Sequence, residues 1–291
     1  MISTFRDIIN RIVVSRNVLY HWNSNQYLNS GRLVLFSHFD KNGEIEPYVI
    51  YYLNHLIKLD CNIVFISTSE NLSRNAIATL EKLCISIIIR KNIGLDFGSW
   101  KTGIFFNQKN FNQYESIILA NDSCYAPVFN LEPIFEQFNN KKNTISGITI
   151  SSEAHRKPHI QSYFVWFNKE KNNYSYLIDF FSKVRFLQNK RKIIKKYEVG
   201  LTQNAIHQGF NYESWVDNIS LKKKYHVENQ NHTIENSILL LKNDLSPMIK
   251  CAIFKDMNLR ELQIELLQIL KTKNMELFKI IKSQIQLDCV L

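Results

Sequence analysis

The sequence predicts an α/β protein, built on one mainly parallel sheet flanked by helices, with N-terminal and C-terminal helical additions. From residue 32 onward, short apolar runs alternate with segments of helical periodicity, which is typical of βαβ units. The chain has 8 glycines and 5 prolines in 291 residues, and no repeat or low-complexity tract divides it. With 45% hydrophobic residues, it can therefore form one sizeable core.

Residues 1–30 are expected to form a helical extension. Arg6, Asp7, Arg11 and Arg16 interrupt the apolar positions, so the segment lacks the uncharged core of a signal peptide and is too short to span a membrane. Its apolar side chains lie opposite the arginines, as in an amphipathic helix. Such a helix can pack on the main domain or lie on a membrane surface, and packing is the favoured interpretation.

The main domain is expected to cover residues 31–245. Pro47 is expected to begin its first helix, because the amide that proline lacks would have no partner in a first helical turn. A second helix is expected over residues 73–83. The expected strands cover residues 32–37, 62–68, 84–90, 117–120, 145–150 and 162–167.

Residues 246–291 are expected to form helices packed on this domain. Leu259, Leu262 and Leu266 are spaced as on the apolar face of an amphipathic helix. The heptads are too few to indicate a coiled coil. These helices can pack back onto the domain or join two copies of the chain in a homo-oligomer.

Charge and cysteine usage limit the partners and the compartment. The net charge of +10 suits nucleic acid, an anionic membrane surface or a phosphorylated substrate. Seven basic residues between Lys183 and Lys196 carry much of the excess, and no nucleic-acid reading motif accompanies them, so nucleic acid is disfavoured. The five scattered cysteines form no CxxC pair, which predicts reduced thiols in a cytoplasmic protein.

Polar segments follow the expected parallel strands and are therefore expected to meet at one edge of the sheet. In open α/β sheets, ligands bind beyond the carboxyl ends of the strands. Such loops can also be polar only because they face water. The residues expected at this edge are His38, Asp40, Ser67, Thr68, the stretch from Arg90 to Lys101, and Asn121 to Ser123.

The segment RKNIGLDFGSWKTG, which begins at Arg90, is the least ordinary part of the chain. Its glycines permit positive φ or a close approach of a ligand to the backbone. It matches neither GxGxxG nor GxxxxGK[ST], so neither a dinucleotide loop nor an ATP loop is supported. Asp96 can accept hydrogen bonds from sugar or ribose hydroxyls, and Arg90, Lys91 or Lys101 can neutralise phosphate. A structural turn explains the segment equally well.

Taken in order, four motifs resemble the rhamnan synthesis protein F family of bacterial polysaccharide glycosyltransferases: HFD, RKNIGLDFGSWKTG, LANDSCYAP and KKYEVGLTQ. The resemblance covers roughly residues 31–215. It implies a GT-A-like (Rossmann-like) fold, a nucleoside-diphosphate sugar donor, with dTDP-rhamnose as the family-level expectation, and transfer to a growing cell-surface glycan or a lipid-linked acceptor. The donor side is then expected to include His38, Asp40, Ser67, Thr68, Arg90, Asn92, Gly94, Asp96, Lys101, Asn121 and Asp122.

The resemblance gives Asn121-Asp122-Ser123 a role. It implies that Asp122 holds Mg²⁺ or Mn²⁺ against the donor diphosphate, where a cation stabilises the charge that develops on the leaving oxygens. A full DxD motif has two carboxylates and this tripeptide has one, which leaves the metal an open question. On the residues alone, the tripeptide is a turn that ends a buried strand.

The resemblance also implies that Glu198 is the general base, which takes the proton of the acceptor hydroxyl in an inverting transfer. Glu198 can equally be a carboxylate that stabilises the N-terminus of a helix. The acceptor side is expected to include His159, Tyr163, Gln203 and His207. Gln203 and His207 lie one helical turn apart, and Tyr163 can stack on a sugar or pack in the core.

Two other classes of function remain open on the sequence alone. A non-catalytic sugar-nucleotide-binding or scaffold subunit of a polysaccharide synthesis complex would bind the donor without turnover. A nucleic-acid-binding protein would show strongly salt-dependent binding. In the favoured interpretation the protein is cytoplasmic, and its basic run allows contact with anionic lipids on the inner face of the membrane.

Overall fold

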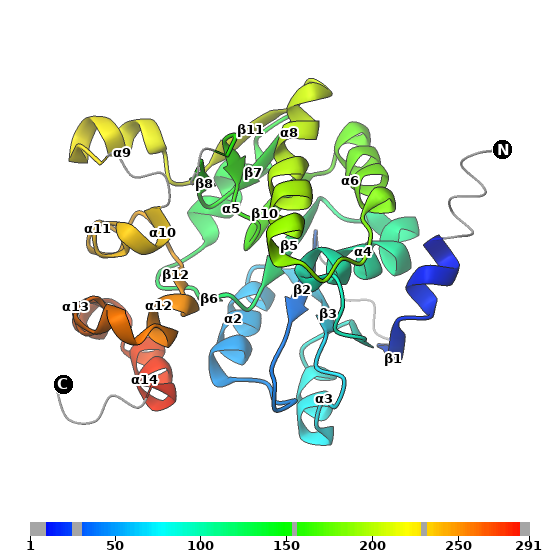
Figure 1. Ribbon diagram of the computed structural model, residues 1–291, viewed down its shortest axis with the longest axis horizontal. Coiled ribbons are helices and arrows are strands. Elements are labelled where there is room, and N and C mark those ends of the chain that lie inside the picture. Colours follow the sequence, from blue (N-terminus) through cyan, green and yellow to red (C-terminus); the bar gives the residue numbers. More distant parts are fainter. Residues whose placement is uncertain (1–9, 25–30, 153–155, 228–231, 286–291) are drawn as a thin grey trace.

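Figure 1 shows the computed structural model, which describes residues 10–24, 31–152, 156–227 and 232–285. An eight-stranded sheet forms its centre, in the order β1-β4-β3-β2-β5-β10-β7-β11. Neighbours from β4 to β5 are parallel, as are β7 and β11, whereas β1 and β10 run antiparallel to their neighbours. The strands are β1 (Val18–Asn23), β2 (Arg32–His38), β3 (Cys61–Ser67), β4 (Ser86–Arg90), β5 (Ser116–Asn121), β7 (Thr144–Gly147), β10 (Phe164–Asn168) and β11 (Asn211–Ser214).

The central strands β2, β3 and β5 are buried along almost their whole length, with apolar middles and polar ends, because helices cover both faces of the sheet. Val34 and Phe36 of β2 point into one core, and Leu33 and Leu35 point into the other, as the two-residue period of a strand requires. The predicted α/β class, with a mainly parallel sheet flanked by helices, is confirmed.

The helices divide between the two faces. The first face is covered by α2 (Pro47–Ile57), α3 (Arg74–Leu80) and α5 (Glu132–Asn139). The opposite face is covered by α4 (Leu95–Asn107), α6 (Lys171–Lys183), α7 (Lys190–Ile193), a π-helical turn (Ile194–Glu198) and α8 (Val199–His207). Pro47 stands in the first turn of α2, as predicted, and the Ser73 hydroxyl caps α3 by accepting from the Ala76 amide.

The prediction of a wholly helical segment over residues 1–30 is wrong for its second half. Residues 10–15 are helical, but Val18–Asn23 forms β1, which pairs with β4 at the edge of the sheet. Tyr20 and Trp22 pack on the core of one face, while His21 lies on the other face against the Phe106 ring. Alternation between the two faces is the two-residue period of a strand. The arginines before residue 18 are spaced as on a helix, so the pattern gave no sign that a strand begins there. Residues 1–9 and 25–30 lie outside the described parts.

The C-terminal segments join the core of the first face, and the last of them, residues 275–284, contacts α2. They contain α9 (Asn218–Tyr225), α10 (His232–Glu235), α11 (Ser237–Lys242), β12 (Ile249–Lys250), α12 (Cys251–Lys255), α13 (Arg260–Lys273) and α14 (Met275–Gln284). Leu266, Leu270 and Ile281 belong to the same core as the α2 side chains. Strand β12 pairs antiparallel with β6 (Cys124–Tyr125), so the segment reaches the end of β5. No helix among the described residues is long and apolar enough to cross a membrane.

Candidate functional site

A cavity of 190 Å³ lies beyond the carboxyl ends of β2 and β5. The chain order reverses between these strands: β3 and β4 extend the sheet to one side of β2, and β5 begins the other side. Ligands of open α/β sheets bind at such a point. The cavity is lined by Leu95, Asp96, Phe97, Asn121, Ser123, Ser162, Tyr163, Lys190, Ile193, Ile194, Glu198 and Lys250.

Asp96 joins the two strands at this point. Its Oδ1 accepts a hydrogen bond from the Ser37 hydroxyl at 2.8 Å, and its Oδ2 accepts one from the Asn121 amide at 3.0 Å. Gly94, with a φ of 84°, caps α4 in the left-handed conformation and so places Asp96 in the first turn of that helix. Burial raises the pKa of Asp96, the two hydrogen bonds oppose that rise, and the nearby Glu198 carboxylate adds to it.

Glu198 lies on the opposite wall, at the end of the π-helical turn. Its Oε1 accepts two hydrogen bonds of 2.9 Å, from the backbone amide and the hydroxyl of Ser162. The helix continues without interruption from Lys190 to His207, so the expected position of Glu198 at a helix start is wrong, and a helix-terminus role is excluded with it. Single π-helical turns within α-helices occur frequently at functional sites.

Asp122 does not line this cavity. Its Oδ2 accepts a hydrogen bond from the Phe39 amide at 2.9 Å, in the loop after β2, and its carbonyl accepts one from the Tyr48 hydroxyl. Burial raises the pKa of Asp122 to about 7; the Phe39 amide opposes this rise and the Asp96 charge adds to it. Among the described residues, no three His, Cys, Asp or Glu side chains form a group that could hold a metal ion.

The polar groups at the end of β5 in the cavity are the amide of Asn121, which is its last residue, the Ser123 hydroxyl and, from β12, the Lys250 ammonium. Mg²⁺ and Mn²⁺ favour anionic oxygen ligands, and Mg²⁺ needs only one or two carboxylates beside a diphosphate. Here the only carboxylate of the tripeptide is directed at the Phe39 amide, and a cation already stands at the strand end. The residues present therefore do not fit Asp122 as a metal ligand facing this cavity.

The sequence interpretation missed Lys250 and Ser162. Lys250 lies 3.4 Å from the Ser123 hydroxyl and 3.9 Å from the centre of the Tyr163 ring. It reaches the cavity only because β12 pairs with β6, and no motif in the sequence marks it. Ser162 precedes an apolar strand like any turn residue, and only its two hydrogen bonds to Glu198 set it apart.

Four residues predicted for the donor side hold neighbouring loops together instead. A ring nitrogen of His38 lies 3.1 Å from the Ser67 hydroxyl, and the Thr68 amide donates to the His38 carbonyl at 2.9 Å. Burial lowers the pKa of His38 to about 4, against the opposing charge of Asp40. The Asp40 carboxylate accepts from two amides of its own loop. None of the four lines the cavity.

Of the three cations predicted to neutralise phosphate, Arg90 and Lys101 are engaged elsewhere, and Lys91 is exposed and does not line the cavity. Arg90 lies 4.9 Å from the Phe186 ring centre and donates to the Ile93 carbonyl, and burial lowers its pKa to about 10. Asn92 is exposed, and its backbone amide donates to Glu70. The structure therefore places Arg90 beneath the loop, as part of its turn, and Asn92 on the surface.

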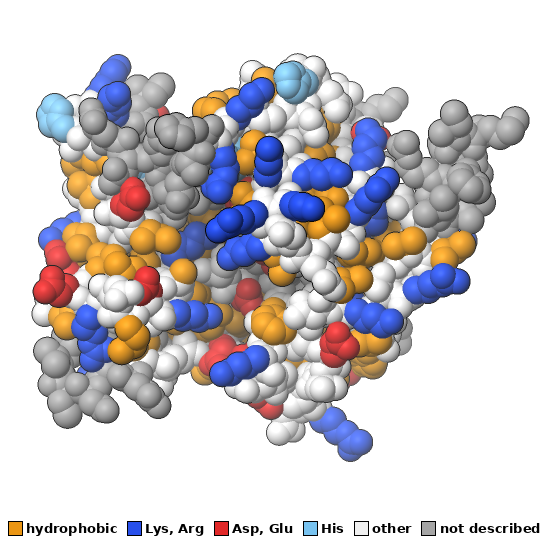
Figure 2. Space-filling model, in the orientation of Figure 1, with side chains coloured by type: hydrophobic (Ala, Val, Ile, Leu, Met, Phe, Trp, Pro, Cys, Tyr) orange, Lys and Arg blue, Asp and Glu red, His pale blue; other side chains and the backbone are white. Residues whose placement is uncertain are grey.

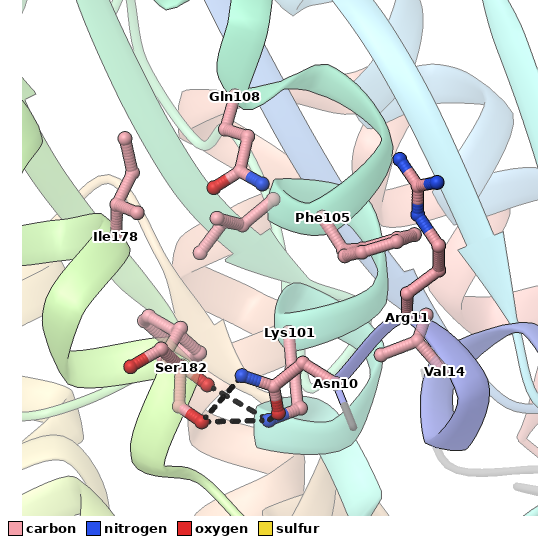
Figure 3. Close-up of a pocket in the computed structure, with 10 residues that line it drawn as sticks. Asn10, Arg11, Val14, Lys101, Phe105, Gln108, Ile178 and Ser182 are labelled. Carbon is pink, nitrogen blue, oxygen red and sulfur yellow. Dashed lines mark hydrogen bonds between the residues drawn. The ribbon is translucent and has the colours of Figure 1, made fainter. Parts of the chain in front are cut away.

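Lys101 lies in a second cavity, of 390 Å³, between α4, α6 and the helical residues 10–15 (Figure 3). Its ammonium donates to the Asn10 side chain and to three carbonyls near the end of α6, at 2.7 to 3.2 Å. Burial lowers the pKa of Lys101 to about 8. Lys101 therefore ties these helices together and does not reach the cavity beyond β5.

Of the residues predicted for the acceptor side, only Tyr163 lines the cavity. The Tyr163 hydroxyl lies 2.7 Å from the Thr149 hydroxyl. Since the hydroxyl has this partner, the ring is the part of Tyr163 that can contact a ligand. His159 is buried in β9 (His159–Ile160), with Nδ1 2.9 Å from the Lys157 carbonyl. Gln203 donates to the Pro158 carbonyl, and His207 is exposed.

Comparisons with known proteins give one family match. The sequence model of rhamnan synthesis protein F matches residues 63–286. The uncharacterised protein y4gN of Sinorhizobium fredii is 28% identical over 164 residues, which are 56% of this chain and 43% of that protein. The chain thus spans less than half the length of this relative.

Similar solved structures are distant. A cytidylyltransferase from Leptospira borgpetersenii is 12% identical, with a TM-score of 0.43 over 85% of this chain and 98% of that one. The glycosyltransferase GlyE of Streptococcus pneumoniae is 13% identical, also with a TM-score of 0.43, over 88% of this chain and 63% of that one. Mouse xyloside xylosyltransferase 1 is 14% identical, with a TM-score of 0.37 over 68% of this chain and 91% of that one.

Proposed function

We propose, from the premise that this chain belongs to the rhamnan synthesis protein F family, that it is a glycosyltransferase with a nucleoside-diphosphate sugar as donor. The family match confirms the resemblance; three of the four motifs lie within the matched residues 63–286, and HFD, at residues 38–40, lies before them. One observation carries the proposal: the carboxylates of Asp96 and Glu198 line one cavity at the point where the strand order reverses. Two carboxylates with different surroundings suit the two tasks of holding a donor and activating an acceptor.

Asp96 is proposed to hold the donor. Each of its carboxylate oxygens accepts one hydrogen bond from the protein and has a second lone pair for a sugar or ribose hydroxyl. The Ser37 and Asn121 donors fix the orientation of the carboxylate, so binding of a donor costs little further side-chain entropy. The diphosphate then lies at the end of β5, near Ser123 and Lys250.

Glu198 is proposed to be the general base. The two Ser162 donors fix Oε1, and the described residues offer no donor to Oε2, which is left for the acceptor hydroxyl. In the reaction, the acceptor oxygen forms a bond to the anomeric carbon while the bond from that carbon to the diphosphate oxygen breaks. The electron pair leaves with the diphosphate, and the proton passes to Glu198. Attack from the side opposite the leaving group inverts the anomeric centre.

A growing cell-surface glycan or a lipid-linked glycan is the proposed acceptor, and rhamnose, delivered as dTDP-rhamnose, is the proposed sugar. A basic surface supports an anionic or membrane-bound partner (Figure 2). This surface, called the basic helix surface below, consists of the exposed residues Arg185, Lys190, Arg191, Lys192, Lys195 and Lys196. None of these six residues forms an ion pair with another described residue.

The basic helix surface stands next to the cavity, because Lys190 is both a member of it and part of the cavity lining. Each lysine close to an anionic leaflet contributes about 1 kcal/mol to membrane binding. We therefore place the protein at the cytoplasmic face of the membrane, with this surface toward the lipid and the acceptor entering beside Lys190.

Ligand-induced stabilisation tests the donor class. A ligand that binds only the folded state raises the melting temperature, and the rise grows with the ratio of the ligand concentration to its Kd. We expect at least one of UDP, GDP, CDP, dTDP and their sugars to raise it, and Asp96→Ala to abolish the increase. No increase with any of these nucleotides, with or without Mg²⁺ or Mn²⁺, would end the proposal.

A further inference from the structure

We propose that Lys250 is the cation that binds the donor diphosphate in this site, in the role that a divalent metal ion would otherwise fill. The inference rests on the proposed function and adds a residue to it. It concerns a side chain that lies outside every motif of the family resemblance.

Strand pairing fixes the position of Lys250. In the β12–β6 ladder Lys250 is opposite Cys124, and the Cys251 amide donates to the Ser123 carbonyl at 3.0 Å. The C-terminal segment is thereby held against the residues that directly follow β5. Since the diphosphate is proposed to lie at the end of β5, the ammonium stands beside it.

The ammonium has hydrogen-bonding capacity left over. An ammonium has three N–H donors, and among the described residues its partners are the Ser123 hydroxyl, at a long 3.4 Å, and the Cys124 thiol, a weak acceptor. No carboxylate of a described residue forms an ion pair with it. The Tyr163 ring, 3.9 Å away, stabilises the positive charge without using an N–H donor. A half-buried cation that lines a cavity with an unused donor, and whose two partners are weak, is arranged for an anionic ligand.

Lys101 shows what a structural lysine looks like in the same protein. Its ammonium has four oxygen acceptors between 2.7 and 3.2 Å, all from elements that it ties together. Lys250 has one distant oxygen acceptor and the Cys124 thiol as partners, and it faces the ligand cavity. The two lysines therefore differ in the way expected for a structural and a ligand-binding residue.

A lysine suits the chemistry. Departure of a nucleoside diphosphate concentrates negative charge on the leaving oxygens, and a fixed positive charge there stabilises the transition state. Lysine acts on phosphate as a compact point charge. A metal ion held by Asp122 is the competing proposal, and the two make opposite predictions about chelators.

Calorimetric titration decides between them. The probe is whichever of UDP, GDP, CDP and dTDP gives the largest thermal shift, titrated in EDTA and again in Mg²⁺. We expect the wild type to bind it in EDTA, Lys250→Met to weaken binding about tenfold or more, and Lys250→Arg to restore most of the affinity. Lys255→Met, which removes an exposed lysine from the same segment, should leave it unchanged. Binding of the corresponding nucleoside, which has no phosphate, should not respond to Lys250→Met.

Three results would overturn the inference. If Lys250→Met binds the nucleotide as tightly as the wild type in EDTA, Lys250 is not the diphosphate cation. If the wild type binds only with Mg²⁺, and Asp122→Asn abolishes that Mg²⁺-dependent binding, the metal proposal stands and the nucleotide site is kept. If no nucleotide binds the wild type under either condition, the proposed function fails and the role of Lys250 fails with it. Should Lys250→Met not fold, Lys250→Arg and the wild-type EDTA titration decide the question.

Discussion

The Oε1 oxygen of Glu198 lies 2.9 Å from both the backbone nitrogen and the hydroxyl oxygen of Ser162. Two donors from one residue hold the carboxylate at the cavity wall, one of them fixed by the backbone. The side chain is thus oriented before an acceptor arrives, which is the arrangement expected of a base that must meet a hydroxyl in one geometry.

Ser162→Ala is expected to lower kcat about 10- to 100-fold while donor binding stays unchanged. The substitution removes one of two hydrogen bonds to a charged group and leaves the backbone amide in place. Steady-state kinetics and nucleotide titration measure the two effects separately. Ser162→Thr, which keeps the hydroxyl, should recover most of the rate. Equal activity in Ser162→Ala and the wild type would show that Oε1 needs only the amide.

Lys101→Met is expected to lower the free energy of unfolding by about 1–3 kcal/mol and to leave nucleotide affinity unchanged. The substitution removes the donor of four hydrogen bonds between helices, and its site is not the cavity beyond β5. Denaturant unfolding and calorimetry provide the two readouts. A loss of nucleotide affinity in a fully folded variant would return Lys101 to the donor site that the sequence suggested.

Asp122 is expected to make stability fall as the pH rises from about 4 to 7. Burial holds its folded-state pKa at about 7, above the ordinary value of 3.8, so between these values the folded state keeps a proton that the unfolded state releases. Stability contributed by that proton is complete below the lower value and is lost as the pH rises through the upper one. Urea unfolding at several pH values should show Asp122→Asn gaining stability relative to the wild type across this range. A constant difference would contradict the assignment.

The sequence was informative where local pattern decides the structure. The apolar runs at residues 32–37 and 117–120 predicted strands that the structure confirms, and Pro47 predicted the start of α2. Asp96, predicted from the chemistry of its segment, and Glu198, predicted from the family resemblance, line the same cavity. These inferences needed only neighbours in the chain or a recognisable order of motifs.

Other residues could not be placed from sequence, because their roles depend on distant partners. Lys101 and Arg90 follow a strand as phosphate-binding cations do, yet carbonyls and an aromatic ring occupy them. Lys250 reaches the cavity through the pairing of β12 with β6, which no local pattern reveals. The sequence alone does not show whether the ammonium of a lysine already has hydrogen-bond partners within the protein.

Replacement of Lys192, Lys195 and Lys196 by glutamine is expected to weaken binding to vesicles that contain anionic phospholipid. Three lysines near a leaflet contribute about 3 kcal/mol, which corresponds to about a hundredfold in affinity. Vesicle sedimentation at physiological salt measures the change. The same replacement of Lys222, Lys223 and Lys224, exposed on α9, removes equal charge from another place and should have a much smaller effect. Equal losses would show that only net charge matters.

The rate at which Glu198→Gln turns over the donor shows whether this chain is a transferase with Glu198 as its general base. Nucleoside-diphosphate release from a panel of sugar nucleotides that includes dTDP-rhamnose is measured with acceptor present, for the wild type, Glu198→Gln and the exposed control Glu136→Gln. We expect the wild type and the control to turn over at least one donor, and Glu198→Gln to bind that donor normally but to react about 10²- to 10⁴-fold more slowly. Turnover by Glu198→Gln at the wild-type rate would show that Glu198 is not the base, and no turnover of any donor by the wild type would show that the chain is not a sugar-nucleotide transferase.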